Sequence, residues 1–293
     1  MSCDAGDQRP APLTSAWLDG VPGVIGEIGR ARAADATSAD SAAKGGTASV
    51  AAAATGFRDA LAGRAARGRA PAIVAEVKRA SPSVGRIADL DPLRTARAYA
   101  AAGAAAVSVL TEPHRFAGEL AHLAAIAREV PLPALRKDFV VHPLQVEEAA
   151  AAGARAVLLI ARLLGDALAA YLRYAESLGL DALVEVHDEA ELASAVACGA
   201  RLIGVNNRDL ASLEIDLGRA PWLIARGRAL AADATWVAES GYRSAPEIVP
   251  LAGRADAVLI GGHLAGSAEP GVALRALRRK VDAGVAAARD PRA

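Results

Sequence analysis

The feature that most constrains the fold of this chain is a repeated unit, in which a short apolar segment is followed by a helical one. From Pro71 onward, apolar segments of about four to six residues recur roughly every 25 to 30 residues. An apolar run without a polar face is typical of a parallel strand buried on both sides. We therefore expect eight strands, near residues 72–77, 106–110, 133–136, 156–160, 182–186, 202–205, 235–239 and 257–260.

Helical segments lie between and after these strands, and most end at a glycine that suits a left-handed C-terminal cap. They are expected at 92–102, 119–129, 143–152, 166–177, 189–198, 217–230, 245–252 and 272–288, and the capping glycines are Gly103, Gly153, Gly179, Gly199 and Gly253. Eight such units in about 215 residues fit an α/β fold of the (β/α)8 TIM-barrel type. The rival, an open doubly wound sheet, usually has a glycine-rich loop after its first strand, and this chain has none there.

The chain divides into an N-terminal extension, residues 1–56, and a barrel domain, residues 57–293. The extension is dominated by Asp, Ser, Thr, Gly and Ala, so we expect it to be irregular and partly disordered, with one short cap helix around residues 15–33. The segment from Phe57 to Leu61 is expected to form an amphipathic turn that docks on the barrel.

Composition limits the classes of partner. The formal net charge of the 293 residues is zero and aromatic residues make up 3%, which disfavours nucleic acid and anionic membranes. No secretory signal or membrane span is visible, and the two cysteines, Cys3 and Cys198, fit a reducing compartment. We expect a cytoplasmic, monomeric protein whose partner is a small molecule.

Polar side chains stand where several expected strands end, which is where a parallel barrel carries its chemistry. Because side chains alternate along a strand, Glu76 and Lys78 share one direction with Val74. If that direction is inward, both project into the barrel mouth. The alternative is an ion pair at the surface.

The same alternation places Lys137, Glu185 and Asn206 on the inward side of three further strands. Any one of them could be a buried polar group whose hydrogen bonds are satisfied. All five together would be costly unless opposite charges compensate one another. The set therefore predicts a site at the mouth.

Two glycine-containing turns indicate a phosphate-binding site. Ser240 and Gly241 follow the seventh strand, and Gly261 and Gly262 follow the eighth and should open a short helix. Barrels often bind phosphate between these loops through backbone N–H groups, although either turn alone is ordinary. The five histidines show no metal-ligand spacing, so we expect neither a metal nor a cofactor.

Five segments resemble those of indole-3-glycerol-phosphate synthase, in that family's order. They are IVAEVKRASPS at 73–83, LRKDF at 135–139, LVEVH at 183–187, IGVNNRD at 203–209 and AESG at 238–241. The resemblance covers about residues 57 to 285. It implies a carboxy-lyase of tryptophan biosynthesis that converts 1-(2-carboxyphenylamino)-1-deoxyribulose 5-phosphate to indole-3-glycerol phosphate, with loss of carbon dioxide and water.

The resemblance also implies catalytic roles. Lys137 would be the general acid of ring closure, and Glu185 would act as acid and base in the dehydration. Glu76 and Asn206 would hold and polarise the intermediate, and Lys78 would pair with the anionic groups of the substrate.

Binding roles are implied in the same way. Ser81 and Arg208 would position the anthranilate carboxylate, and Phe116 would lie against the aromatic ring. The phosphate would be held by Ser240, Gly241, Gly261, Gly262 and Lys78.

The chain departs from the family pattern at two points near the expected site. Gly262 takes the place of a residue that would offer a side-chain contact, and Glu119 could repel an anionic substrate if it pointed inward. Two other functions stay open, namely another phosphosugar barrel enzyme and a non-catalytic barrel that binds a phosphorylated ligand. An isomerase of phosphoribosylanthranilate would need a cysteine and an aspartate as its acid–base pair, and the first strand lacks the cysteine.

Overall fold

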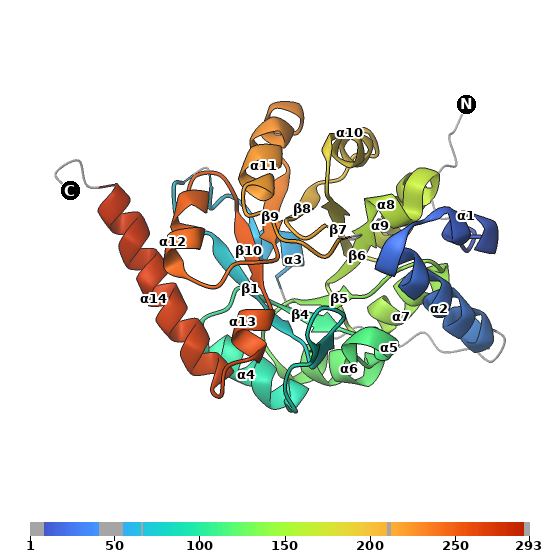
Figure 1. The fold of residues 1–293 in the computed structure, drawn as a ribbon, viewed down its shortest axis with the longest axis horizontal. Coiled ribbons are helices and arrows are strands. Elements are labelled where there is room, and N and C mark those ends of the chain that lie inside the picture. The colour runs from blue at the N-terminus through green and yellow to red at the C-terminus, as the bar shows by residue number, and fades with distance from the viewer. Residues whose placement is uncertain (1–8, 41–54, 66, 210–211, 290–293) are drawn as a thin grey trace.

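Eight parallel strands close into a barrel, with helices packed around it (Figure 1). The computed structural model describes residues 9–40, 55–65, 67–209 and 212–289. Around the barrel the strands follow the order β1-β10-β9-β8-β7-β6-β5-β4, and β4 pairs with β1 to close it. Their bounds are β1 Ala72–Val77, β4 Ala106–Leu110, β5 Ala134–Lys137, β6 Ala156–Ile160, β7 Asp181–Val186, β8 Leu202–Asn206, β9 Thr235–Glu239 and β10 Ala257–Ile260.

The barrel class and all eight strands are confirmed, with boundaries within one residue of those expected. The helices that follow the strands are α4 Pro92–Ala102, α5 Pro113–Phe116, α6 Leu120–Glu129, α7 Pro143–Ala151, α8 Ala161–Leu164, α9 Leu168–Ser177, α10 Glu189–Ala197, α11 Arg219–Leu230, α12 Ala245–Ile248, α13 Gly262–Ala265 and α14 Pro270–Ala288. Short 3-10 turns, η1 Gly165–Ala167 and η2 Val249–Leu251, adjoin α9 and α12. All five expected capping glycines have positive φ, between 75° and 84°.

Alternation along each strand separates two hydrophobic cores. Val74, Leu135, Leu183 and Val237 belong to the cluster inside the barrel. Their outward-facing neighbours, such as Trp236, pack against the surrounding helices. The inward direction assumed for the charged strand ends is therefore correct, because residues two positions before them lie in the inner core.

The N-terminal extension is more helical than the sequence indicated. Instead of one helix around residues 15–33 there are two, α1 Ser15–Gly20 and α2 Gly23–Asp40, separated at Val21 and Pro22. Proline has no N–H to donate and restricts the residue before it, which accounts for the break. The loose structure expected up to about residue 50 is wrong for residues 33–40, which belong to α2. Residues 1–8 and 41–54, on which the same expectation falls, lie outside the described residues.

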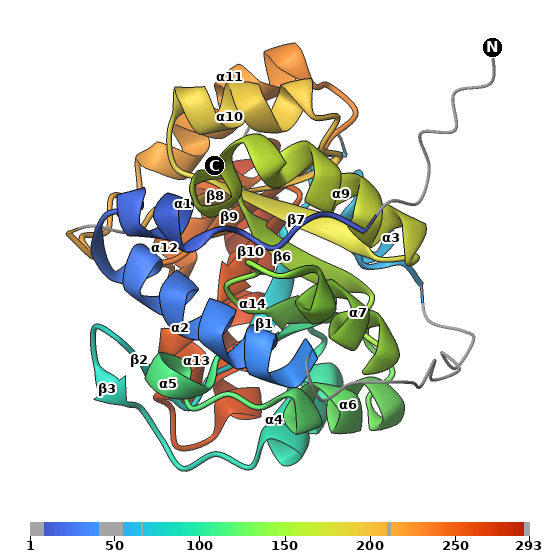
Figure 2. The ribbon, with the colours of Figure 1, turned by 90° about the vertical axis from the view of Figure 1, so that its right-hand side faces the viewer.

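Helix α2 lies against α7 and α8 at one side of the barrel (Figure 2). Its Ile25 packs into the inner core from the end of the barrel where the strands finish. At the opposite end α3, Phe57–Leu61, closes the barrel with Phe57 and Leu61, which are fully buried in the same core. The expected docking of this segment is confirmed.

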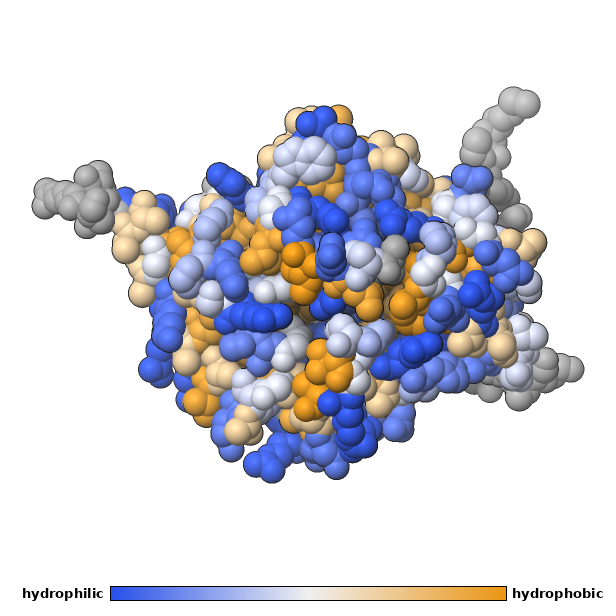
Figure 3. All heavy atoms as spheres, in the orientation of Figure 1, coloured by the Kyte–Doolittle hydropathy of each residue, from blue (hydrophilic) through white to orange (hydrophobic). Residues whose placement is uncertain are grey.

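A two-stranded hairpin after β1 was not expected. Its strands, β2 Ala80–Ser81 and β3 Gly85–Arg86, pair antiparallel across a turn at residues 82–84, and Gly85, the first residue of β3, has a φ of +72°. The hairpin places Ser81 and Val84 beside the barrel mouth. On the face seen in Figure 3, which has the orientation of Figure 1, hydrophobic residues gather near the middle among mainly hydrophilic ones. Among the residues that the structure describes, no helix has the length and apolar character to cross a membrane.

One contact between a helix and the barrel gives a matched test of packing. A Cβ at Gly227 of α11 would overlap the indole ring of the buried Trp236, whereas a Cβ at Gly20 of α1 would meet no atom within 4 Å. We expect Gly227→Ala to lower the free energy of unfolding by roughly 1–3 kcal/mol, the usual result of overpacking. Gly20→Ala should leave it unchanged or slightly raised. Equal denaturation midpoints for the two variants would contradict this account.

Candidate active site

A cavity of about 680 Å³ opens at the end of the barrel where the strands finish. All twelve residues that the sequence singled out line it: Glu76, Lys78, Ser81, Phe116, Lys137, Glu185, Asn206, Arg208, Ser240, Gly241, Gly261 and Gly262. Apolar residues of α2, including Ile25 and Ile28, line it as well. The expected convergence on one cavity is therefore present, and the N-terminal extension contributes to its wall.

Glu76 and Lys78 form an ion pair inside the cavity, not at the surface. Lys78 Nζ lies 2.5 Å from Glu76 Oε1, and the two side chains are only 17% and 5% exposed. The backbone of Gly261 comes so close that a Cβ there would overlap the Glu76 carboxylate. The absence of a side chain at residue 261 therefore makes room for the ion pair between Glu76 and Lys78.

Lys137 carries the central positive charge. Its Nζ lies 3.0 Å from Glu185 Oε2 and 3.6 Å from Glu239 Oε2, so the cation sits between carboxyl groups of two other strands. Burial alone would lower the pKa of Lys137, but the charges of Glu185, Glu239 and Glu76 raise it above its usual range. Lys137 is therefore an ammonium donor at neutral pH.

Glu185 is held as an acceptor. Lys137 donates to its Oε2, and Asn206 Nδ2 donates to its Oε1 over 3.1 Å. Burial would raise the pKa of Glu185, but the charge of Lys137 and the neighbouring His187 keep it well below its usual range. This carboxyl group is therefore ionised at neutral pH.

Glu239 is a site residue that the sequence analysis missed. It is 1% exposed, and its Oε1 has no hydrogen-bond partner. Burial, followed by the charges of Glu185 and Glu76, raises its pKa to about 8 against the attraction of Lys137. A Cβ at Gly204 would overlap this Oε1, so the glycine of β8 makes room for it. Alternation from Val237 would have indicated Glu239, whereas we assigned its segment to a phosphate turn.

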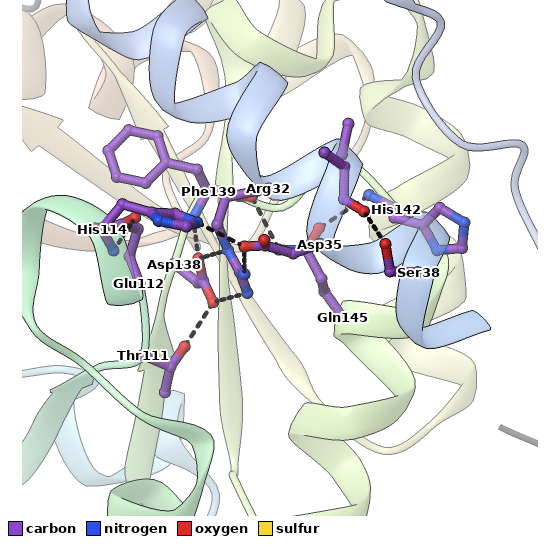
Figure 4. A network of polar contacts seen from close by, with 12 residues as sticks. Arg32, Asp35, Ser38, Thr111, Glu112, His114, Asp138, Phe139, His142 and Gln145 are labelled. Carbon is purple, nitrogen blue, oxygen red and sulfur yellow. Dashed lines mark hydrogen bonds and ion pairs between the residues drawn. The ribbon is translucent and has the colours of Figure 1, made fainter. Parts of the chain in front are cut away.

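The strand end that carries Lys137 is fixed from its other side. Asp138 accepts from Arg32 of α2 through two hydrogen bonds of 2.9 Å and from Thr111 Oγ1 over 2.6 Å (Figure 4). The buried Arg136 donates to the same carboxylate and to Gln145 O. Burial would raise the pKa of Asp138, but Arg136 and Arg32 keep it below its usual range. These ion pairs connect the N-terminal extension to the residue beside Lys137.

A second connection orders the segment that carries Phe116. The buried Glu112 caps α5 by accepting from the backbone N–H groups of His114, Arg115 and Phe116. His114 Nε2 lies 2.9 Å from Asp35 Oδ2 of α2 (Figure 4). The ring of Phe116 then stands 6.0 Å from that of Phe139, centroid to centroid, and both rings line the cavity.

The opposite side of the cavity is built from backbone and cations. Ser240 and Gly241 have φ values of +64° and +92°, a sharp turn that Asn207 supports by donating from Nδ2 to Ser240 O over 3.0 Å. Arg208 Nη1 donates to Leu213 O over 2.8 Å. Burial and the charge of nearby Arg243 lower the pKa of Arg208. Both arginines line the cavity, so this side attracts anions.

Glu119 does not point into the cavity. Its side chain is 59% exposed and lies near Arg79 and His122, so the repulsion of an anionic substrate considered above is not supported. Gly262, in contrast, faces open space, with no atom within 4 Å of where a Cβ would stand. Within the described ranges, no cluster of three or more His, Cys, Asp or Glu side chains has the arrangement of a metal site.

Comparison with known proteins identifies the relatives of this chain. The family model described as indole-3-glycerol phosphate synthase matches residues 29–277. The chain is 54% identical over 211 residues to the indole-3-glycerol phosphate synthase of Deinococcus radiodurans, which covers 72% of this chain and 79% of that protein. It is 47% identical over 237 residues to the enzyme of the same name from Micrococcus luteus, covering 79% and 87%.

Solved structures with the same fold are more distant in sequence. The tryptophan synthase of M. tuberculosis in its aminoacrylate-bound form gives a TM-score of 0.56 at 19% identity, covering 79% of this chain and 100% of that one. Tryptophan synthase subunit alpha of Legionella pneumophila gives 0.57 at 12% identity, covering 80% and 100%. At these identities the likeness supports the barrel fold alone.

The raised pKa of Glu239 predicts how a variant changes stability with pH. The folded protein keeps this proton up to about pH 8, whereas a free glutamate loses it near 4.5. The wild type therefore loses stability relative to Glu239→Gln as pH rises from about 4.5 to 8, by up to about 1.4 kcal/mol per pH unit. We expect the melting temperature of Glu239→Gln minus that of the wild type to grow between pH 5 and pH 8.

Glu247 of α12 provides the control. Burial would raise its pKa, but hydrogen bonds from the backbone N–H groups of Arg243 and Ser244 lower it. Glu247 is therefore ionised throughout this range, and the difference between Glu247→Gln and the wild type should stay flat. A flat difference for Glu239→Gln as well would contradict the raised pKa.

Proposed function

This chain belongs to the indole-3-glycerol phosphate synthase family, and on that premise we propose that the residues around its cavity divide the family's reaction among themselves. The enzyme converts 1-(2-carboxyphenylamino)-1-deoxyribulose 5-phosphate to indole-3-glycerol phosphate, with loss of carbon dioxide and water, in tryptophan biosynthesis. The observation that carries the proposal is the Lys137 ammonium, buried at the barrel mouth between the carboxyl groups of Glu185 and Glu239.

Ring closure needs an acid at the ketone oxygen. As the aromatic carbon attacks the ketone carbon, negative charge develops on that oxygen, and the Lys137 ammonium can donate both a hydrogen bond and a proton to it. Loss of carbon dioxide from the attacking ring carbon, which bears the carboxylate, then restores the aromatic ring. Glu76, which is paired with Lys78, and Asn206 hold and polarise the intermediate.

Dehydration needs a base at carbon and an acid at the departing hydroxyl group. Glu185 is ionised and can take a proton from the carbon adjacent to the one that bears the hydroxyl group. Lys137 Nζ lies 3.0 Å from Glu185 Oε2. Once Lys137 has regained a proton, it can protonate the leaving oxygen. Glu239, whose pKa is raised to about 8, can supply that proton to Lys137 over 3.6 Å.

Substrate binding uses the two ends of the cavity. At the cationic end, backbone N–H groups of Ser240, Gly241, Gly261 and Gly262 bind the phosphate, and Lys78 adds charge. Ser81 and Arg208 position the anthranilate carboxylate. The aromatic ring lies against Phe116, with Phe139 and Ile25 completing an apolar wall.

A direct assay tests the function. Incubation of the purified chain with the carboxyphenylamino substrate should produce indole fluorescence. A rise in fluorescence is not expected from an isomerase of phosphoribosylanthranilate or from a barrel that only binds phosphate. If the folded protein binds the substrate but forms no product, the hypothesis that this cavity is an active site is overturned.

Lys137→Ala tests the general acid. We expect turnover to fall on the order of 100- to 10,000-fold, the usual loss when a positioned acid is removed. Lys280→Ala, which removes an exposed lysine from α14, should leave turnover unchanged. Circular dichroism spectra of both variants report folding. More than half of the wild-type kcat in Lys137→Ala would refute the assignment.

The two glycines after β10 should respond differently to substitution. A side chain at Gly261 would overlap the Glu76 carboxylate and crowd Lys78, so Gly261→Val should raise KM sharply and also lower kcat. Gly262 faces open space, so Gly262→Ser should be tolerated, or should tighten binding by about 0.5–1.5 kcal/mol through one new hydrogen bond. Steady-state kinetics measures KM and kcat, and titration with inorganic phosphate measures the affinity of the anion site in both variants. Wild-type phosphate affinity in Gly261→Val would place the anion elsewhere.

A further inference from the structure

His187 is a buried titratable residue for which the reaction steps above have no use. It follows β7 directly and points to the same side as Glu185, two positions earlier, but it does not line the cavity. Its Nε2 lies 3.4 Å from Glu185 Oε1, and its Nδ1 lies 2.9 Å from Glu191 Oε2. The ring therefore stands behind Glu185, on the side away from the substrate.

Glu191 of α10 is itself held firmly. Its Oε2 also accepts from the backbone N–H of His187 over 2.9 Å, and its Oε1 accepts from Arg162 Nε over 2.5 Å. Arg162 in turn pairs with Asp188, the N-cap residue of α10. A row of alternating charges thus runs inward from Arg162 through Glu191 and His187 to Glu185.

The partners of the ring determine its charge. An ionised carboxylate only accepts hydrogen bonds, so a ring placed between two of them is favoured when both nitrogens carry protons. Burial would lower the pKa of His187, but its contacts with Glu185 and Glu191 raise it to about 9. The titratable groups that face Glu185 and His187 from the neighbouring strands include Lys137 of β5 and Glu239 of β9.

We propose that His187 is a positioning residue for the reaction, an imidazolium that orients the Glu185 carboxylate and keeps it ionised when Lys137 gives up its proton. At that moment Glu185 loses the nearest cation, and a buried carboxylate without one would take up a proton instead of serving as a base. His187 lies beside the other oxygen of Glu185, Oε1, so its positive charge stays next to the carboxylate. The proposal rests on the proposed role of Glu185 in the dehydration.

The pH dependence of kcat tests this role between about pH 6 and 10. The wild-type kcat should fall near pH 8, where Glu239 gives up its proton, and fall further as pH rises through about 9, where His187 loses its charge. His187→Gln keeps an amide that can donate a hydrogen bond but carries no charge. Its kcat at pH 7 should be about 10-fold to 100-fold lower, because the positive charge that keeps Glu185 ionised is lost while a donor group remains. The fall near pH 9 should be absent, and KM should change little.

Glu191→Gln gives a graded second variant. It keeps an oxygen that can accept from Nδ1 but removes the negative charge, so the fall in kcat near pH 9 should move to lower pH. His142→Gln is the matched control, because His142 is also buried and accepts at Nδ1 from the N–H of Leu144 to cap α7. It should lower the melting temperature and leave the position of the fall unchanged.

NMR titration of the His187 ring in the wild type reads its charge without activity. Both ring nitrogens should stay protonated through pH 8. The proposal would be overturned by a neutral His187 ring at pH 7. It would also be overturned if the fall in kcat near pH 9 came at the same pH in Glu191→Gln as in the wild type, or if the kcat of His187→Gln still fell near pH 9. If His187→Gln does not fold, Glu191→Gln and the titration decide.

Glu185→Gln separates this proposal from the one beneath it. Full turnover in Glu185→Gln would refute the role of Glu185 and with it that of His187. Loss of turnover in Glu185→Gln, together with unchanged pH dependence in His187→Gln, would refute the role of His187 alone.

Discussion

The buried charge of Lys137 is the constraint around which the rest of the barrel mouth is arranged. An ammonium group in this position is costly unless carboxylates compensate it, and they must come from other strands because β5 ends there. They come from β7 and β9, since Glu185 Oε2 lies 3.0 Å and Glu239 Oε2 3.6 Å from Lys137 Nζ. Gly204 of β8, the strand between them, leaves the space that the Glu239 carboxyl group fills. Lys137 keeps Glu185 ionised, whereas burial and the charge of Glu185 raise the pKa of Glu239 against the attraction of the same cation.

The same strand end is fixed from outside the barrel. The neighbours of Lys137, Arg136 and Asp138, form a buried ion pair with each other, and Asp138 also binds Arg32 of the N-terminal extension. Helix α2 also brings Ile25 and Ile28 to the cavity wall. Removing one partner of a buried ion pair is more disruptive than removing a surface pair, since it leaves a charge without compensation. The extension is therefore part of the site.

Alternation along strands was sufficient to predict which polar residues meet. Glu76, Lys137 and Glu185 lie at inward positions because the residues two places earlier on their strands lie in the inner core, and Asn206 does so because Leu202, four places earlier, lies there. The same rule applied to Val237 would have found Glu239, which we missed because its segment also matched a phosphate turn. Arg32 could not have been found in this way, since no local pattern relates residue 32 to residue 138.

The sequence by itself determined the barrel, its eight strands and the residues at its mouth, because strand burial, helix capping and alternation are local properties of the chain. Only the tertiary structure decided how these residues act on one another. The raised pKa of Glu239, the ionised Glu185 and the charged His187 follow from burial and from distances of 2.9 to 3.6 Å between groups on different elements. Electrostatic energies depend on such distances and on exclusion of water, and both arise only when the barrel has closed.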